Sequence, residues 1–525
     1  MARLVKKSPS LCTDLPLDNT DICNRLHLLR QLLRSCIGPT GRLKQVHNNI
    51  GGHVITTSTS SVLLPAISSS QSFINLIKTS ILNHVSRFSD CGLFAALLCL
   101  SLIEQAKQSG LRGNVATTVN QHLLGLCTSY LQRQDCGCKV KLDFCSSQSL
   151  ITLARSIVSS KPACVLTEQE ALHISKLAVQ AFLLTVPCNS PGVVSLGKIV
   201  TVSVEGHSVL NSAVFPGLLL DMPDVFFLNK VENLHSNPTC MVLFSASLAG
   251  DLSDLGGIIE VHPGVDTDSQ ILDQLLKLGN QVVKDEVKLF VCQKVIHPVL
   301  QHHLRSHGII VIERLGITLM EPLAQLTGAQ PVATMHTTIP AKAYGRVVCH
   351  KTEHVLRLTL REPSALLGGG CTETHLAAYV RHKSMDNVTE TVSVLGCSQT
   401  EYLCGVEGFC RSLESVAAAL EHDGGNSLMD LTHAHHWSTR ANVMEELTEG
   451  SSGFCGCGLV ESSTNQKWTY LNTKYPQFSP APLFRVPTVQ PRVLDSFTAK
   501  LNALQVAVET ANLALDVRYL IQDMN

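Results

Sequence analysis

Residues 89–108 read SDCGLFAALLCLSLIEQAKQ, a short polar turn followed by a segment that is apolar on nearly every side. A helix without a polar face has to be buried among other elements, because it leaves no side for water. The apolar run from Cys91 to Ile103 is interrupted by Ser101 and is too short to cross a bilayer core of about 30 Å. We therefore predict a buried helix from about Asp90 to Gln108, at the centre of a helical core and outside the membrane.

Helical periodicity continues on both sides of this segment. Residues 21–36 repeat apolar side chains every three or four positions, with Asp21 as the expected N-cap and Gly38-Pro39 as the stop. Residues 496–515 show the same spacing. The other predicted elements are helices over 117–131 and within 146–185, a strand at the start of 53–64, and a closing strand in which Val517, Tyr519 and Ile521 alternate.

The middle of the chain has a different pattern. Short β-branched runs at 199–204, 241–244, 290–295 and 309–312 alternate with helical stretches such as 269–278. That alternation is typical of an α/β module. A chain of 525 residues is also too long for one core and should form roughly three domains. The order is helical, mixed and helical again, which favours a middle module inserted into a helical domain.

Composition excludes several classes of function. The net charge is −1 and the pI is about 7.1, so the chain lacks the basic excess that nucleic acids and anionic membranes attract. Aromatic residues make up only 5%, which also disfavours base stacking. The first 16 residues carry basic side chains but no apolar stretch behind them, unlike a signal peptide. We expect a cytoplasmic protein that binds neither nucleic acid nor membrane.

Cysteines and histidines invite a metal interpretation. The chain has 20 cysteines, and without a secretion signal they are expected to be reduced and mostly to act as small apolar side chains. Structural zinc sites usually space their cysteines by two to four residues, and no Glu or Cys near the histidines completes a ligand set. The interpretation favoured is no metal at the pairs Cys136/Cys138 and Cys455/Cys457, nor at the groups His433/His435/His436 and His302/His303/His307.

Two glycine-containing turns suggest phosphate binding. Gly38-Pro39-Thr40-Gly41 follows the first predicted helix, and Ser89-Asp90-Cys91-Gly92 precedes the buried one. Glycine lets backbone N–H groups approach an anion, and a helix N-terminus attracts it. A turn that only joins two helices would look the same, so each signal by itself is weak.

Taken together, several segments resemble the archaeal and eukaryotic cytosolic (TCP-1) chaperonin family. The turn at 37–42 is similar to the family's LGPKGM loop, 89–92 to its GDGTT turn and 156–161 to its TSLNSK segment. Their order and spacing along nearly the whole chain carry the resemblance. The other matching segments are 54–56 with 62–63, the strand at 215–222, residues 307–332 with their TGA turn at 327–329, the triple glycine at 368–370, and the AxExA pattern of Ala507, Glu509 and Ala511.

The resemblance implies a multidomain α+β chaperonin fold with nested domains. A helical equatorial domain would take residues 1–137 and 371–525. A small intermediate domain would take 138–199 and 336–370. An α/β apical domain at 200–335 would bind clients or partners. Only residues 330–350 bridge the TGA turn and the helix before the triple glycine, so the return leg of the intermediate domain is expected to be shortened; a splice form, a gene-model error and true divergence remain open.

The resemblance also implies a nucleotide site, which here is degenerate. Asp90 occupies the family's magnesium-binding position. The two phosphate-contacting threonines after it correspond to Gly92 and Leu93, and the catalytic aspartate corresponds to Lys351. We expect no catalytic residue and no efficient ATPase, with weak binding of ATP and magnesium left open and no other cofactor. The family's nucleotide-binding positions fall on Gly38, Pro39, Gly41, Asp90, Cys91, Gly92, Ser160, Lys161 and Gly369; its Asn-Asp-Gly turn falls on Thr57, Ser58 and Thr59.

Within that family, the chain is most similar to the McKusick-Kaufman/Bardet-Biedl group of chaperonin-like proteins. The residues that carry this are 42–45, 88–92, 160–164, 293–298, 362–379, 420–425 and 504–512. The group implies a chaperone and assembly factor for the ciliary BBSome, near centrosomes and basal bodies. The implied partners are other members of the group, the ring chaperonin CCT/TRiC and BBSome subunits. The alternatives are an ATP-hydrolysing, ring-forming folding subunit and a scaffold that binds no nucleotide.

Overall fold

The computed structural model divides into two units, one of which is assembled from two segments of sequence. Met1–Val179 and Leu356–Asn525 form the first unit, and Gln180–Val355 forms the second. The described residues are 11–47, 54–67, 69, 71–143, 146–185, 199, 201, 203, 206–215, 217–218, 239–250, 267–334, 338–347, 364–439, 453–463, 466–482 and 491–522.

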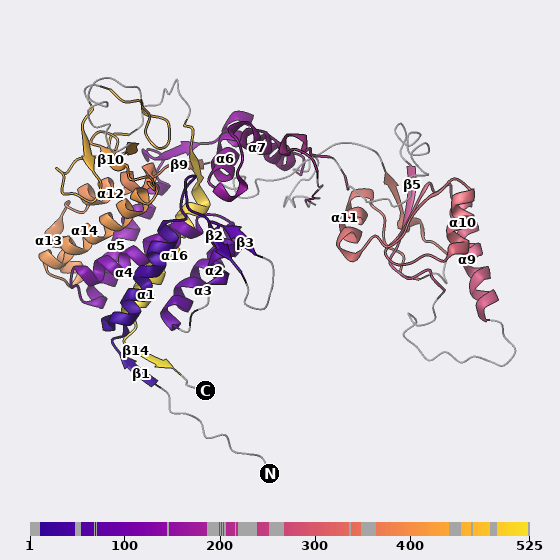
Figure 1. Cartoon of the computed structure of the whole chain (residues 1–525), viewed down its shortest axis with the longest axis horizontal. Helices are drawn as coiled ribbons and strands as arrows, with labels where there is room; N and C mark the ends of the chain where they lie inside the picture. Colours follow the sequence, from indigo (N-terminus) through magenta and orange to yellow (C-terminus); the bar gives the residue numbers. More distant parts are fainter. Residues whose placement is uncertain are drawn as a thin grey trace, which may run out of the picture. The chain divides into compact units, whose positions relative to one another are not determined.

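The first unit is mainly helical and is built around α4 (Gly92–Gln108), which is buried on all sides. The helix α16 (Phe497–Asp516) packs along α4 and also along α5 (Gly113–Gln132), and all three belong to the helical unit in Figure 1. This packing explains why residues 89–108 have no polar face. The other helices are α1 (Thr20–Arg34), α2 (Ser60–Ala66), α3 (Ser72–Phe88), α6 (Ser147–Ser159), α12 (Cys371–Lys383), α13 (Val388–Leu395), α14 (Gln399–Ala418) and α7 (Glu168–Leu183), which crosses the boundary between the units.

Among the described residues of this unit, four small antiparallel sheets border the helices. The pairing of β9 with β13 matters for function, because it sets the glycines that follow β9 beside the strand that leads into α16. The pairs and triplets are β1 (Leu11–Asp14) with β14 (Tyr519–Gln522), β2 (Lys44–Val46) with β3 (Ile55–Thr57), β9 (Ser364–Leu367) between β13 (Leu494–Ser496) and β4 (Lys139–Lys141), and β10 (Asn426–Asp430) between β11 (His436–Thr439) and β12 (Trp468–Tyr470).

In the described part of the second unit, four strands form a sheet in the order β7-β6-β5-β8. Alternate residues of β5 point to opposite faces: Val242 and Phe244 join one apolar core, and Met241 and Leu243 join the other. In Figure 1, α9 and α10 cover the first face and α11 the second. The elements are β5 (Thr239–Phe244), β6 (Leu289–Cys292), β7 (Ile310–Ile312), β8 (Tyr344–Val347), α9 (Thr267–Lys284), α10 (Pro298–Ser306) and α11 (Ile317–Thr327).

Most predicted elements are confirmed. The helices predicted over 21–36, 90–108, 117–131 and 496–515 correspond to α1, α4, α5 and α16. Strands β5, β6 and β7 confirm three of the apolar runs of the middle region, and β14 confirms the closing strand. The run at 199–204 and the segment at 215–222 lie partly outside the described residues, and Lys351 lies wholly outside them.

One local expectation needs correction, and one segment without a prediction forms a strand. The N-cap of α1 is Asn19, not Asp21, because the Asn19 side chain accepts a hydrogen bond of 2.8 Å from the backbone N–H of Asp21. Residues 341–350, which show little periodicity in the sequence, include β8, which pairs with β5 from Thr239 to Val242. No helix in the described part of the chain combines the length and the apolar character needed to cross a membrane.

Candidate functional site

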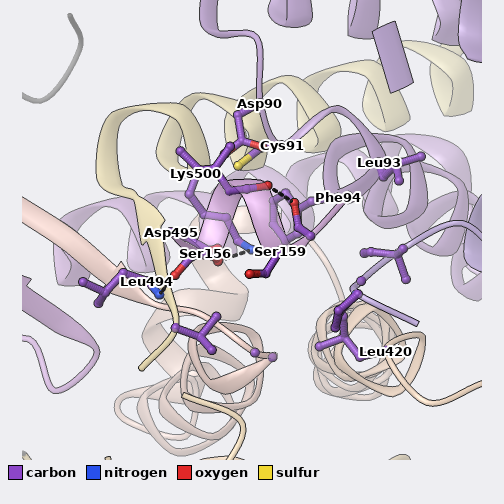
Figure 2. A pocket seen from close by; sticks show the side chains of 18 of the residues that line it. Asp90, Cys91, Leu93, Phe94, Ser156, Ser159, Leu420, Leu494, Asp495 and Lys500 are labelled. Carbon is purple, nitrogen blue, oxygen red and sulfur yellow. Dashed lines mark hydrogen bonds and ion pairs between the residues drawn. The ribbon is translucent and has the colours of Figure 1, made fainter. Parts of the chain in front are cut away.

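A cavity of about 350 Å³ lies in the first unit, where seven separate segments meet (Figure 2). Its volume is in the usual range for small-molecule sites. The segments are the turn after α1, the start of α2, the start of α4, the end of α6, the triple-glycine turn with the start of α12, the end of α14, and β13 with the start of α16. Eight of the nine predicted nucleotide-binding residues line it: Gly38, Pro39, Asp90, Cys91, Gly92, Ser160, Lys161 and Gly369.

Two non-glycine residues in the turn before α4 adopt a backbone conformation that usually requires glycine. Ser89 has φ of 57° and Cys91 has φ of 58°, in the left-handed region that non-glycine residues seldom adopt. Cys91 is the N-cap of α4, and its side chain makes no capping hydrogen bond. The free N–H groups of the first turn are therefore available to an anion at the cavity.

Gly92 and Leu93 continue this wall but add no polar side chain. A β-carbon at Gly92 would overlap the side chains of Ser60 and Val85, so this position has no room for a threonine. Leu93 lines the cavity directly. In Figure 2, Leu93 and Leu420 lie on the right of the cavity, across from Lys500 and Asp495 on the left. One side of the site is therefore apolar.

The turn after α1 contributes its backbone. Gly38 has φ of 84°, and a β-carbon there would lie 2.9 Å from a methyl group of Leu420. Gly41 does not line the cavity; its N–H donates to the carbonyl of Gly38 at 3.2 Å and closes the turn. Gly41 therefore shapes the loop, whereas Gly38 and Pro39 face the site.

A buried ion-pair network occupies the charged side. The Lys500 ammonium donates to Glu373 and, at 3.0 Å, to Asp495, and it lies 4.1 Å from the centre of the Phe94 ring. Burial would lower the pKa of Lys500, but the carboxylates of Asp495 and Glu373 outweigh it and raise that pKa. Burial raises the pKa of Asp495, against the opposing effect of Lys500. Lys500 is therefore charged, and its charge is already balanced by protein carboxylates.

The other basic side chains of the lining are only partly available for phosphate. Arg155 pairs with Glu168, and the guanidinium of Arg492 lies 4.3 Å from the centre of the Phe454 ring. Lys161 follows the C-cap of α6 and is half-buried. A triphosphate with magnesium would meet few uncommitted charges here.

At the predicted magnesium-binding position, the side chain available is the carboxylate of Asp90. Asp90 lines the cavity, and its backbone carbonyl accepts a hydrogen bond of 2.9 Å from Nε2 of His84. Asp90 belongs to no group of three or more potential metal ligands within the described ranges. Thr57, Ser58 and Thr59 are absent from the lining, which includes Ser60 instead.

These features define a cavity of small-molecule size in the helical unit, lined by most of the positions that the family resemblance predicts. A model of the TCP-1/cpn60 chaperonin family matches residues 29–355, and the chain belongs to that family.

Individual relatives agree with this assignment. The chain is 43% identical to Molecular chaperone MKKS of Homo sapiens and 40% identical to that of Mus musculus, each over 576 residues and 100% of both chains. It is 21% identical over 477 residues to thermosome subunit beta of Methanothermobacter thermautotrophicus, covering 79% of this chain and 82% of that one. The matches confirm the resemblance predicted from the sequence.

The alignments also reveal a length difference. Each MKKS alignment has 576 positions and includes all of this chain, which has 525 residues, so at least 51 positions have no residue here. These relatives therefore contain residues that have no counterpart in this chain.

Sequence reasoning missed two features of the first unit. It did not find the Lys500 network, since a lysine, a glutamate and an aspartate spread over 128 residues of sequence carry no local pattern. It was also wrong that no cysteine accompanies the histidines: Cys371, Cys455 and Cys457 surround His435. Only the two closely spaced cysteines gave a hint of that cluster.

Proposed function

We propose that the chain is a chaperonin-derived molecular chaperone and assembly factor that does not hydrolyse ATP efficiently. Leu93 carries this proposal, because it lines the cavity at the start of α4 where the family resemblance expects a phosphate-contacting threonine. A leucine side chain offers no hydrogen bond to phosphate. The neighbouring Gly92 cannot be replaced by threonine without displacing Ser60 or Val85.

Hydrolysis can be tested directly. Purified full-length protein should release phosphate at the background rate, and Asp90→Ala should leave that rate unchanged. Turnover comparable to a working ring chaperonin, abolished by Asp90→Ala, would contradict the proposal. Leu93→Thr alone should not restore turnover, since the position at Gly92 still offers no hydroxyl.

Weak binding of ATP or ADP with magnesium at Asp90 is part of the same proposal. The cavity volume and the open N-terminus of α4 support it, and the neutralised Lys500 argues for low affinity. Titration with a fluorescent ATP analogue, competed by ATP, separates this from a scaffold that binds no nucleotide. Asp90→Ala should abolish the magnesium dependence of binding.

We further propose the nested three-domain organisation expected above, with 200–335 as the apical, partner-binding domain between intermediate segments 138–199 and 336–370. The proposed partners are other chaperonin-like proteins of the McKusick-Kaufman/Bardet-Biedl group, CCT/TRiC and BBSome subunits, in the cytoplasm near centrosomes and basal bodies. The similar proteins of Homo sapiens and Mus musculus are named molecular chaperones, and this supports a chaperone role. Affinity purification of the endogenous protein, read by mass spectrometry, tests the partners.

The main alternative is a ring-forming, ATP-driven folding subunit. It predicts that the purified protein alone migrates near the size of a complete double ring, whereas an assembly factor runs as a small species. Native mass spectrometry without added partners distinguishes them.

A further inference from the structure

Four potential metal ligands lie close together inside the first unit, although they are not regularly spaced in the sequence. They are Cys371 at the start of α12, His435 just before β11, and Cys455 and Cys457 on a tight turn. Their ligand atoms all lie within 4.8 Å of one another, and their exposed fractions are 0%, 0%, 3% and 0% respectively.

The distances fit a tetrahedron around one ion. Nδ1 of His435 lies 3.4 Å from Sγ of Cys455 and 3.8 Å from Sγ of Cys457, and the two sulfurs are 3.3 Å apart. Zinc bonds of about 2.3 Å to sulfur and 2.0–2.1 Å to nitrogen place tetrahedral ligand atoms about 3.6–3.8 Å apart. The atoms of His435, Cys455 and Cys457 therefore need only a few tenths of an ångström of adjustment to surround a zinc ion, and Sγ of Cys371 lies within 4.8 Å of each of them.

The chain around the cluster is arranged to hold sulfur in this position. The N–H of Val460 points at Sγ of Cys455 at 3.2 Å, and the N–H of Gly458 donates to the Cys455 carbonyl at 2.7 Å. Gly456 packs directly on the backbone of Gly369, where a β-carbon on either residue would overlap the other. Backbone N–H donors stabilise a thiolate, and the glycine contact brings the turn close to Cys371.

Two simpler explanations account for less. A disulfide needs a sulfur–sulfur distance of about 2.05 Å, and these cysteines are unpaired. A plain apolar packing of reduced thiols does not need a histidine. His435 is fully buried, and its Nδ1 faces the sulfurs of Cys455 and Cys457 at 3.4 Å and 3.8 Å. A buried imidazole nitrogen that faces two thiols is better explained by a metal ion that binds all three groups.

We propose that Cys371, His435, Cys455 and Cys457 bind a structural zinc ion. Three thiolates and one imidazole fill all four positions of a tetrahedral ion, which is typical of structural rather than catalytic zinc. This proposal is independent of the proposed chaperone function and of nucleotide binding.

The zinc ion would brace one wall of the cavity. Cys371 follows Gly369 and Gly370, which line the cavity, and the carbonyl of Cys457 accepts a 2.7 Å hydrogen bond from the N–H of Arg492 at the start of the segment that leads into β13. Loss of the ion should therefore loosen both the triple-glycine turn and that segment, and lower the stability of the first unit.

Metal analysis of the full-length chain tests the proposal. Protein expressed with zinc and purified under reducing conditions without chelator should hold one zinc per chain. Cys371→Ser and Cys457→Ser should each lower that content several-fold. Cys136→Ser is the matched control: Cys136 and Cys138 form the same Cys-Gly-Cys pattern, buried with sulfurs 3.4 Å apart, but belong to no larger ligand group within the described ranges, so this variant should keep its zinc.

A second measurement covers variants that fail to fold. Wild-type protein refolded with cobalt in place of zinc should show thiolate-to-cobalt charge-transfer bands and the intense visible bands of tetrahedral cobalt, and zinc should bleach them. Substoichiometric zinc in the wild type, iron in place of zinc, equal zinc in Cys371→Ser, or cobalt spectra of octahedral type would each overturn the proposal.

Discussion

Cys91 is a residue at which this chain tolerates backbone strain. It lies in the left-handed region at φ 58°, immediately before α4. Replacing it by glycine should remove the steric cost of that conformation and stabilise the first unit by up to about 1 kcal/mol. The expected result is a higher midpoint of thermal unfolding. Cys99→Gly is the control, because Cys99 lies inside the same helix and glycine there should lower the midpoint.

His375 provides a pH-dependent contribution to stability. Its Nδ1 lies 2.8 Å from the carbonyl of His433 and its Nε2 lies 2.7 Å from the Tyr130 hydroxyl, so the neutral ring donates to the first and accepts from the second. Burial lowers its pKa from 6.5 to about 4, and the bond to His433 only partly opposes this. His375 therefore binds a proton below pH 6.5 in the unfolded chain, but only below about pH 4 in the folded chain.

The sign of the effect follows. Above pH 6.5, His375 is neutral in both states and the free energy of unfolding keeps its full value. As the pH falls from 6.5 towards 4, the free energy of unfolding decreases by a total on the order of 3 kcal/mol. His375→Gln keeps one donor and one acceptor but cannot titrate, so its unfolding midpoint should fall less between pH 7 and pH 5 than that of the wild type. Equal slopes for both proteins would refute this assignment.

At the scale of single elements, α12 and α14 are joined by a buried ion pair. Arg381 donates to Glu414 at 2.7 Å and also contacts Glu407 and Tyr475, and the Glu414 side chain is fully buried. Removing one partner of a buried pair leaves the other charge unsolvated, at a cost of about 3–5 kcal/mol.

A double-mutant cycle measures this pair. Glu414→Leu and Arg381→Met should each lower the unfolding midpoint strongly, and the double variant should recover much of the loss, because no unpaired charge remains. Arg411→Met is the control, since Arg411 makes a half-exposed pair with Glu407 and should have little effect. Additive effects of the two buried substitutions would contradict the argument.

The elements also show what the sequence could predict. α4 was predictable because it is apolar on nearly every side, and α16 because its apolar residues recur at helical spacing. Eight lining residues were predictable because the family resemblance orders them along the chain. The cysteine cluster was not, because His435 and Cys371 are brought to Cys455 only by tertiary pairing. Asn19 rather than Asp21 caps α1 because of the backbone conformation of the residue before the helix, which local composition does not determine.

At the scale of the whole molecule, the two units have separate apolar cores. Phe290 lies in a core made only of second-unit residues, and Phe497 lies in the main core of the first unit. Both side chains are nearly fully buried, at 0% and 2% exposure. A core that shares no side chains with another is expected to unfold as its own cooperative unit.

Calorimetry of the full-length chain should therefore resolve two transitions. Phe290→Ala removes a buried ring at a cost of about 3–5 kcal/mol and should lower one transition while leaving the other in place. Phe497→Ala is the matched substitution and should lower the other transition by a comparable amount. If zinc braces the first unit, chelation should shift the transition that responds to Phe497→Ala and spare the one that responds to Phe290→Ala. A single transition that both substitutions shift equally would mean that the units fold as one body, because a change in either core would then be felt by the whole chain.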